Sequence, residues 1–269
     1  MNARGRRELL LVAAGFLVYF GVRAVTQGSH AEAVENARTL MSVERWLGIY
    51  WEPSIQAAVT DHHWLVTLVN WVYIWGHWPL IAAVAVWLFT RHPEAFRRTR
   101  TAFFVSGAIG MAFFILYPVA PPRLVDAGFM DTVARYSHAY RALQPPSLVN
   151  RYAAFPSLHF GWDLLIGLAL VANARSIAAR ALGVAMPVAM AVAVVLTGNH
   201  WIIDVAAGAA ISLLGLAIAT RLTSDRPPRV GWGSPRNAAY TARRGPTGRR
   251  PPQPGRRSGD PARPRASSR

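Results

Sequence analysis

The sequence contains no cysteine, and its 29 Lys and Arg residues are all arginine. Without thiols, neither a disulfide framework nor a thiolate metal site is available to this chain. Acidic residues are also few, because 13 Asp and Glu stand against 29 Arg and leave a formal net charge of +16. The hydrophobic residues, 52% of the chain, gather in long runs rather than at helix or strand periods. Such runs predict a polytopic membrane protein.

Six of these runs approach or reach the length that spans a bilayer as a helix. They are residues 9–25, 64–90, 101–117, 160–174, 181–197 and 201–220. We therefore predict an all-α polytopic membrane protein with six transmembrane helices. The first run follows three arginines and could be a cleaved signal peptide. An uncleaved helix is preferred, because the later spans then alternate correctly across the membrane.

The segments between the runs are polar. Residues 28–62 carry interrupted apolar positions and are predicted as one or two amphipathic helices at the membrane interface. Residues 91–100 are predicted as a short basic loop and residues 118–154 as a long polar loop. We divide the chain into a membrane-embedded domain, residues 1–222, and a disordered Arg- and Pro-rich cytoplasmic tail, residues 223–269.

The arginines are distributed unevenly about the predicted spans. Of the 29, 22 lie on the side that holds both chain termini, which the positive-inside rule makes cytoplasmic. We therefore expect a multi-pass protein of the cell membrane whose basic tail contacts anionic lipid rather than nucleic acid. Four arginines in the external 118–154 loop oppose the rule, and an anion bound there would explain them; they are Arg123, Arg135, Arg141 and Arg151.

Two short motifs place a histidine at the mouth of an apolar helix on the predicted external side. They are Phe155–His159 and Thr197–Asp204. Each histidine is followed four residues later by an aspartate, Asp163 or Asp204, which shares its face on a helix. Ionisable groups are costly inside a membrane and usually functional. The pattern predicts a phosphoryl-transfer site at the membrane surface.

The residue types suggest a division of roles. His200 is the predicted nucleophile, Asp204 would hold its tautomer, and His159 is the predicted general acid. Ser157 would start a helix whose N–H groups suit phosphate, and Arg123 and Arg151 would add guanidinium contacts. Asp163 has two open interpretations, since it could orient His159 or bond another helix. No metal ligand set is predicted.

The sequences Pro156-Ser157-Leu158-His159 and His200–Asp204 resemble the second and third signature motifs of the type 2 phosphatidic acid phosphatase superfamily. Leu158 in place of Gly, together with Tyr117–Arg123 and Thr197–Trp201, is most similar to its inositolphosphotransferase (inositol phosphorylceramide synthase-like) branch. The resemblance implies a six-helix core and catalysis without metal or cofactor. It also implies a phosphohistidine intermediate at His200 and protonation of the leaving group by His159.

The chain departs from the superfamily pattern at the phosphate-binding positions. It has no lysine for the first motif, and Val194 stands where an arginine is expected six residues before the nucleophile. The phosphate contacts must then come from other groups, with Arg123, Arg151, Asn199 and backbone N–H groups as candidates.

Several functions remain open from the sequence. The leading prediction is transfer of a lipid headgroup to a lipid or polyol acceptor, and hydrolysis to inorganic phosphate is the nearest alternative. A redox protein would use His77, His159 and His200 as haem ligands. A metal hydrolase could use two His and two Asp, and a transporter has little support because no inverted repeat is evident. His77 alone is interpreted as an interhelical polar residue.

Overall fold

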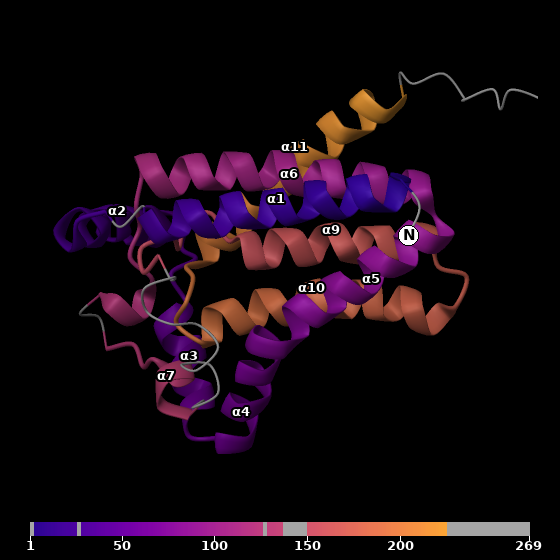
Figure 1. Cartoon of the computed structure of the whole chain (residues 1–269). Coiled ribbons are helices and arrows are strands. Elements are labelled where there is room, and N and C mark those ends of the chain that lie inside the picture. Colours follow the sequence, from indigo (N-terminus) through magenta and orange to yellow (C-terminus); the bar gives the residue numbers. More distant parts are fainter. Residues whose placement is uncertain (1–2, 26–27, 126–127, 137–149, 225–269) are drawn as a thin grey trace, which may run out of the picture. The chain divides into compact units, whose positions relative to one another are not determined.

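The computed structural model describes residues 3–25, 28–125, 128–136 and 150–224, and it is helical (Figure 1). Within these residues only Val119 and Ala153 form a bridge of the β type. The helices are α1 Ala3–Val25, α2 His30–Leu47, α3 Glu52–Thr60, α4 His63–Trp71, η1 Val72–Gly76, α5 His77–Arg91, α6 Pro93–Leu116, η2 Pro122–Leu124, α7 Thr132–Tyr136, α9 Leu158–Asn173, α10 Ile177–Leu196 and α11 Ile202–Ser224.

Four helical stretches of the described chain are long and apolar enough to cross a membrane. They are His63–Arg91, Pro93–Leu116, Ile177–Leu196 and Ile202–Thr223. They coincide with the second, third, fifth and sixth predicted spans, which supports a multi-pass membrane protein. Helix α9 covers the fourth predicted span but is apolar over a shorter length, and α1 is not among the four. The prediction of six spans is therefore confirmed only in part.

The basic segment 91–100 is a helix rather than the predicted loop. Only His92 separates α5 from α6, and α6 begins at Pro93 with Glu94 in its first turn. Proline is favoured at the first helical position, where its missing N–H has no partner to lose, and an acidic residue there complements the helix dipole. The arginines 97, 98 and 100 thus lie in the first turns of α6, and Arg100 forms an ion pair with Glu8 of α1.

Four helices, α6, α9, α10 and α11, form the packed centre, and α1 lies along α6 (Figure 1). Close approach depends on glycine at two crossings. A Cβ on Gly167 of α9 would lie 2.2 Å from the carbonyl oxygen of Gly183 of α10. A Cβ on Gly208 of α11 would lie 2.2 Å from the carbonyl oxygen of Ser157. The second crossing presses α11 onto the start of α9, and it brings the two histidine motifs together.

The region between the first and second predicted spans forms the two helices α2 and α3. Ser29 caps α2 by accepting the N–H of Glu32, and Gly48, at a φ of 73°, ends it in the left-handed conformation that glycine favours. The apolar face of α2 packs on the 118–154 loop through a cluster that includes Trp201. The location of α2 and α3 at a membrane interface remains a prediction.

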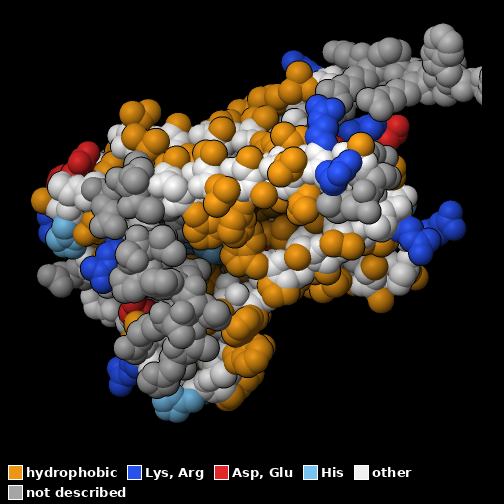
Figure 2. All heavy atoms as spheres, in the orientation of Figure 1, with side chains coloured by type: hydrophobic (Ala, Val, Ile, Leu, Met, Phe, Trp, Pro, Cys, Tyr) orange, Lys and Arg blue, Asp and Glu red, His pale blue; other side chains and the backbone are white. Residues whose placement is uncertain are grey.

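The outward face formed by α1, α5 and α6 carries abundant hydrophobic side chains (Figure 2). Large apolar residues on it are well exposed, for example Leu17 at 72% and Val86 at 64%. Exposed apolar faces of this extent are expected where helices contact lipid. The predicted tail, residues 223–269, lies outside the described residues except for its first two positions in α11.

Candidate active site

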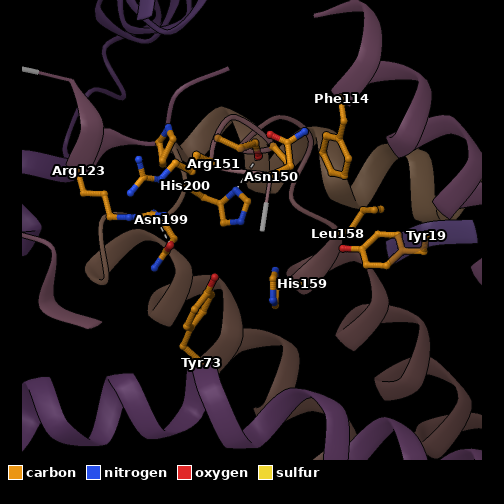
Figure 3. A pocket seen from close by; sticks show the side chains of 13 residues that line it. Tyr19, Tyr73, Phe114, Arg123, Asn150, Arg151, Leu158, His159, Asn199 and His200 are labelled. Carbon is orange, nitrogen blue, oxygen red and sulfur yellow. Dashed lines mark hydrogen bonds between the residues drawn. The ribbon is translucent and has the colours of Figure 1, made fainter. Parts of the chain in front are cut away.

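A small cavity of about 40 Å³ lies where the two histidine motifs meet (Figure 3). His159 at the start of α9 and His200 just before α11 both line it, with ring centroids 6.2 Å apart. The remaining lining residues come from α1, η1, α6, the 118–154 loop, the start of α9 and the turn before α11; they are Tyr19, Tyr73, Phe114, Pro121, Arg123, Asn150, Arg151, Ala153, Ala154, Leu158 and Asn199.

His200 is held from one side by two acceptors. Its Nδ1 lies 2.7 Å from the carbonyl oxygen of Ala154 and 3.3 Å from Oδ2 of Asp204. A carbonyl oxygen can only accept, so Nδ1 must carry the hydrogen. The lone pair of the neutral ring is then on Nε2, the nitrogen on the other side of the ring. The predicted role of Asp204, to hold one tautomer, is thus shared with the backbone.

The turn between α10 and α11 fixes this histidine through its own backbone. The N–H groups of Asn199 and His200 both donate to the carbonyl of Val194, at 3.1 and 3.0 Å. Gly198 adopts a φ of 68°, which side-chain-bearing residues rarely adopt. Val194, the position where an arginine was expected, is fully buried and serves as this anchor.

Two buried glutamates, one in α2 and one in α3, accept backbone N–H groups at the start of α11. Oε1 of Glu52 accepts the N–H of Ile202, and Oε1 of Glu44 accepts the N–H of Ile203, both at 2.8 Å. These N–H groups belong to the first turn of α11, where a helix has no internal acceptor for them. Burial raises the pKa of Glu44 to about 9, and the hydrogen bond to Glu52 adds to the rise. Glu44 therefore carries its proton at neutral pH.

His159 lies in the first turn of α9, directly after the cap. The hydroxyl of Ser157 accepts a hydrogen bond from the N–H of Phe160 at 3.5 Å. The backbone N–H of Ser157 donates to the carbonyl of Asp204 at 3.0 Å. Ser157 is completely buried and does not line the cavity. It therefore acts as a helix cap, and its predicted contact with phosphate stays untested.

The cationic side of the cavity is formed by Arg123, next to Asn199. The guanidinium donates to Oδ1 of Asn199, and its Nε lies 3.2 Å from Oδ2 of Asp131. The backbone N–H of Arg123 donates to Gly198, which ties η2 to the His200 turn. Arg151, which is exposed, also lines the cavity. Three of the predicted phosphate ligands are thus brought together here.

Asp163 does not contact His159, although the two lie four residues apart on α9. Its Oδ1 lies 2.8 Å from Nδ1 of His77, at the start of α5. Of its two interpretations, the structure agrees with a bond to another helix. Of the other predicted loop arginines, Arg135 lies in α7, and Arg141 falls outside the described residues.

Sequence patterns gave no indication of several residues near the histidines. Tyr73 and Tyr19 come from apolar helices where aromatic residues are common, and Asn150 from a loop without a motif. Glu44 and Glu52 lie in the segment predicted as amphipathic, where charged residues are ordinary. Their spacing from each other carries no signal, because the α11 backbone groups that they bind lie 159 and 150 residues away in sequence.

A search of the described residues finds no group of three or more His, Cys, Asp and Glu that could hold a metal ion. The predicted independence from metal is a statement about the reaction, and it remains a prediction. The polar groups on the cavity are two imidazoles, two guanidiniums, two amides and two phenols. Such a set can bind an anion, attack it and move a proton.

The fold and site together define a helical membrane protein with a cavity between its helices that is lined by two histidines and two arginines. The model of the PAP2 superfamily matches residues 38–218, and the chain belongs to this superfamily of membrane phosphatases and phosphotransferases. The matched range includes both histidine motifs, the 118–154 loop and the two glutamates. Comparison with curated proteins and with solved structures finds no match.

Proposed function

We propose that the protein transfers a phosphoryl group or a phosphate-linked headgroup from a membrane lipid, through a phosphohistidine at His200. The observation that carries this proposal is the convergence of His200, His159 and Arg123 on one cavity, with the His200 tautomer held at Nδ1. This tautomer leaves Nε2 to attack phosphorus, which is the requirement for a nucleophilic histidine.

The first half-reaction forms the bond from Nε2 of His200 to phosphorus and breaks the bond from phosphorus to the leaving oxygen. His159 donates a proton to that oxygen, and the 6.2 Å between the two rings leaves room for a phosphoryl group between them. Arg123 and Asn199 would contact the non-bridging oxygens, where negative charge is concentrated. Asp204 would stabilise the imidazolium that forms at His200.

The second half-reaction returns the enzyme to its starting state. The neutral His159 accepts a proton from water or from an alcohol, whose oxygen attacks phosphorus and displaces His200. Water gives inorganic phosphate from a phosphomonoester, or the headgroup phosphate from a phosphodiester, while an alcohol such as inositol or diacylglycerol gives a new ester. The likeness of Leu158 and the Tyr117–Arg123 segment to inositolphosphotransferases favours the alcohol, so we propose transfer as the main reaction.

A lipid substrate is supported by a second cavity beside the first. It has a volume of about 360 Å³ and lies among α1, α5, α6 and α9, and almost all of its lining is apolar. Tyr19 lines both cavities, so the apolar space adjoins the histidine site. An acyl chain could lie there while the phosphate reaches His200. With the arginine distribution, we propose cytoplasmic termini and a site that faces the outer leaflet.

The proposal is tested with purified protein in detergent, in the presence of EDTA. Labelled lipid phosphates and phosphodiesters are incubated with and without inositol or diacylglycerol, beside His200→Ala. Loss of label from the lipid with wild type but not with the variant is expected, and the product distinguishes phosphate release from transfer. Equal behaviour of the two proteins on every substrate would overturn the proposal. A visible absorption band in the purified protein would favour the haem alternative instead.

A further inference from the structure

A second imidazole–carboxylate pair lies behind the histidine site and has no part in the mechanism above. Nδ1 of His77 lies 2.8 Å from Oδ1 of Asp163, and the two residues are exposed by only 1% and 0%. The pair links the start of α5 to α9. Since a carboxylate oxygen is an acceptor, Nδ1 of His77 donates to it.

The pair is directly adjacent to His159. The ring centroids of His77 and His159 are 4.8 Å apart, closer than the 6.2 Å that separates His159 from His200. Tyr73 lies 5.0 Å from the His159 ring. Tyr73 and His77 are four residues apart, so the ring of His159 is in contact with two residues of one helical stretch (Figure 3 shows His159 and Tyr73).

That stretch has an irregular backbone. The five residues of η1, Val72–Gly76, form a π-helix between α4 and α5, and His77 follows immediately. Single π turns inside α-helices are rare and frequently occur at functional sites. Here the π turn carries Tyr73 and leads directly into His77, the two residues of this stretch that touch His159.

We propose that the His77–Asp163 pair is a positioning unit for His159. The pair fixes the His159 ring and determines how readily His159 donates and accepts the proton. The inference rests on the proposed function, because it assigns His159 the role of general acid. The pair is buried, where the local dielectric is low, so its effect on a ring at this distance is large compared with that of a solvated pair. His77 touches no substrate and acts only through His159.

The alternative role is a polar contact that holds two helices together, as such residues do in many membrane proteins. The two roles differ in how variants respond to the leaving group. A lipid alkoxide needs a proton from His159 as it leaves, whereas 4-nitrophenolate leaves without one. In the first half-reaction, damage to the general acid therefore affects the lipid ester selectively, while damage to the fold affects both esters alike. The second half-reaction, in which His159 is the base, is common to both esters, so the first is measured separately.

The experiment compares dioctanoyl phosphatidic acid with 4-nitrophenyl phosphate on the full chain in detergent. Where the lipid assay identifies a phosphodiester as substrate, that diester and its 4-nitrophenyl ester are used instead. His77→Asn retains an N–H donor for Asp163 but removes the imidazole. In pre-steady-state measurements of leaving-group release, we expect its rate on the lipid to fall by about 10²-fold, within the range for general acid catalysis. Its rate of 4-nitrophenolate release in the same measurement, and its KM, should change by less than about 3-fold.

A second variant and three controls complete the test. Asp163→Asn keeps an acceptor for His77 but removes the charge, and it should show the same selectivity if His77→Asn does not fold. His159→Ala should show it more strongly. Asn70→Ala breaks a buried bond to Thr132 between α4 and α7, away from the histidines, and should lower both rates in equal proportion.

The outcomes separate the two proposals. Equal losses on both esters in His77→Asn and Asp163→Asn, as in Asn70→Ala, would show a purely structural pair and overturn the inference. His200→Ala must abolish turnover of both esters. If it does not, the proposed function fails, whatever the His77 variants do.

Discussion

The carbonyl oxygen of Ala154 lies 2.7 Å from Nδ1 of His200, so the backbone just before one histidine motif fixes the tautomer of the other. Ala154 precedes Phe155 and Pro156, which start the turn into α9. The same motif returns a second bond, from the N–H of Ser157 to the carbonyl of Asp204. The two motifs therefore position each other through backbone groups, and neither histidine depends on its aspartate alone.

This shared support predicts an intermediate effect for Asp204→Asn. The amide oxygen can still accept the N–H of Trp201, which now donates to Asp204 at 2.8 Å, and the Ala154 carbonyl still holds Nδ1. What is lost is the negative charge beside the imidazolium. We expect kcat to fall by about 10²–10³-fold, as when one preorganised electrostatic partner is removed. His200→Ala should leave only background, measured by release of label from the lipid substrate. A loss equal to that of His200→Ala would show that Asp204 does more than stabilise charge.

Arg123→Gln should weaken the capture of phosphate. A hydrogen bond to a charged group contributes about 1.5–3 kcal/mol, which corresponds to a loss of roughly 10–150-fold in kcat/KM. The matched control is Arg38→Gln, because Arg38 is 63% exposed and pairs only with the exposed Glu35 in α2. Steady-state kinetics on the same lipid should show the loss at position 123 alone. Unchanged kcat/KM in Arg123→Gln would remove this residue from the phosphate site.

Glu44→Gln should change how stability depends on pH. The pKa of Glu44 is about 9 in the folded chain, whereas the ordinary pKa of glutamate is 4.5. Between these values the unfolded chain binds fewer protons, so the stability of the folded chain falls as pH rises through the window and levels off above it. The glutamine cannot ionise and still offers an oxygen to the N–H of Ile203. We therefore expect a flatter dependence.

The measurement is thermal unfolding of the detergent-solubilised protein at pH 5 and at pH 8.5. The advantage of Glu44→Gln over wild type should be greater at the higher pH. Glu35→Gln, an exposed residue of the same helix at 73% side-chain exposure, should follow the wild type at both values. Identical pH dependence of Glu44→Gln and wild type would contradict a proton held on Glu44. Glu52 and Asp204 are the other acidic groups near Glu44.

The sequence predicted the histidine motifs because their information is local. A histidine and an aspartate at a helix mouth, with proline and serine before them, specify a cap and a face within eight residues. The long apolar helices are equally local, since composition and length suffice. The predicted third span begins at residue 101, whereas α6 begins at Pro93. The charge of residues 91–100 is typical of a loop, although Pro93 and Glu94 favour a helix start.

The remaining site residues depend on packing between distant segments. Glu44 and Glu52 bind backbone N–H groups of α11, and a backbone group has no sequence signature at all. The partner of Asp163 is His77, 86 residues away, rather than His159 at helical spacing on the same helix. The irregular η1 segment, which brings Tyr73 and His77 to His159, interrupts an apolar run whose pattern gives no sign of it.

Gly107→Leu should shorten the acyl chain that the enzyme accepts. Gly107 of α6 lines the apolar cavity opposite Trp162, and a Cβ there would lie 3.4 Å from Cζ2 of the Trp162 ring, an ordinary contact. The backbone can therefore carry a side chain, whose further atoms would occupy part of the 360 Å³. We expect KM for a dioleoyl substrate to rise by about 10-fold or more. That is the size of effect that about two displaced methylene groups produce, at about 0.8 kcal/mol for each buried CH₂.

The comparison with a dioctanoyl substrate makes the prediction specific to the cavity, because a short chain need not reach the blocked region. Its KM should stay within about 2-fold of wild type, and kcat should be unchanged for both lipids, since His159 and His200 are not altered. Gly21→Leu is the matched control: it adds the same side chain to α1, at a position with nothing within 4 Å of the added Cβ. If Gly107→Leu affects both chain lengths equally, or if Gly21→Leu has the same selectivity, the acyl chain does not lie in this cavity.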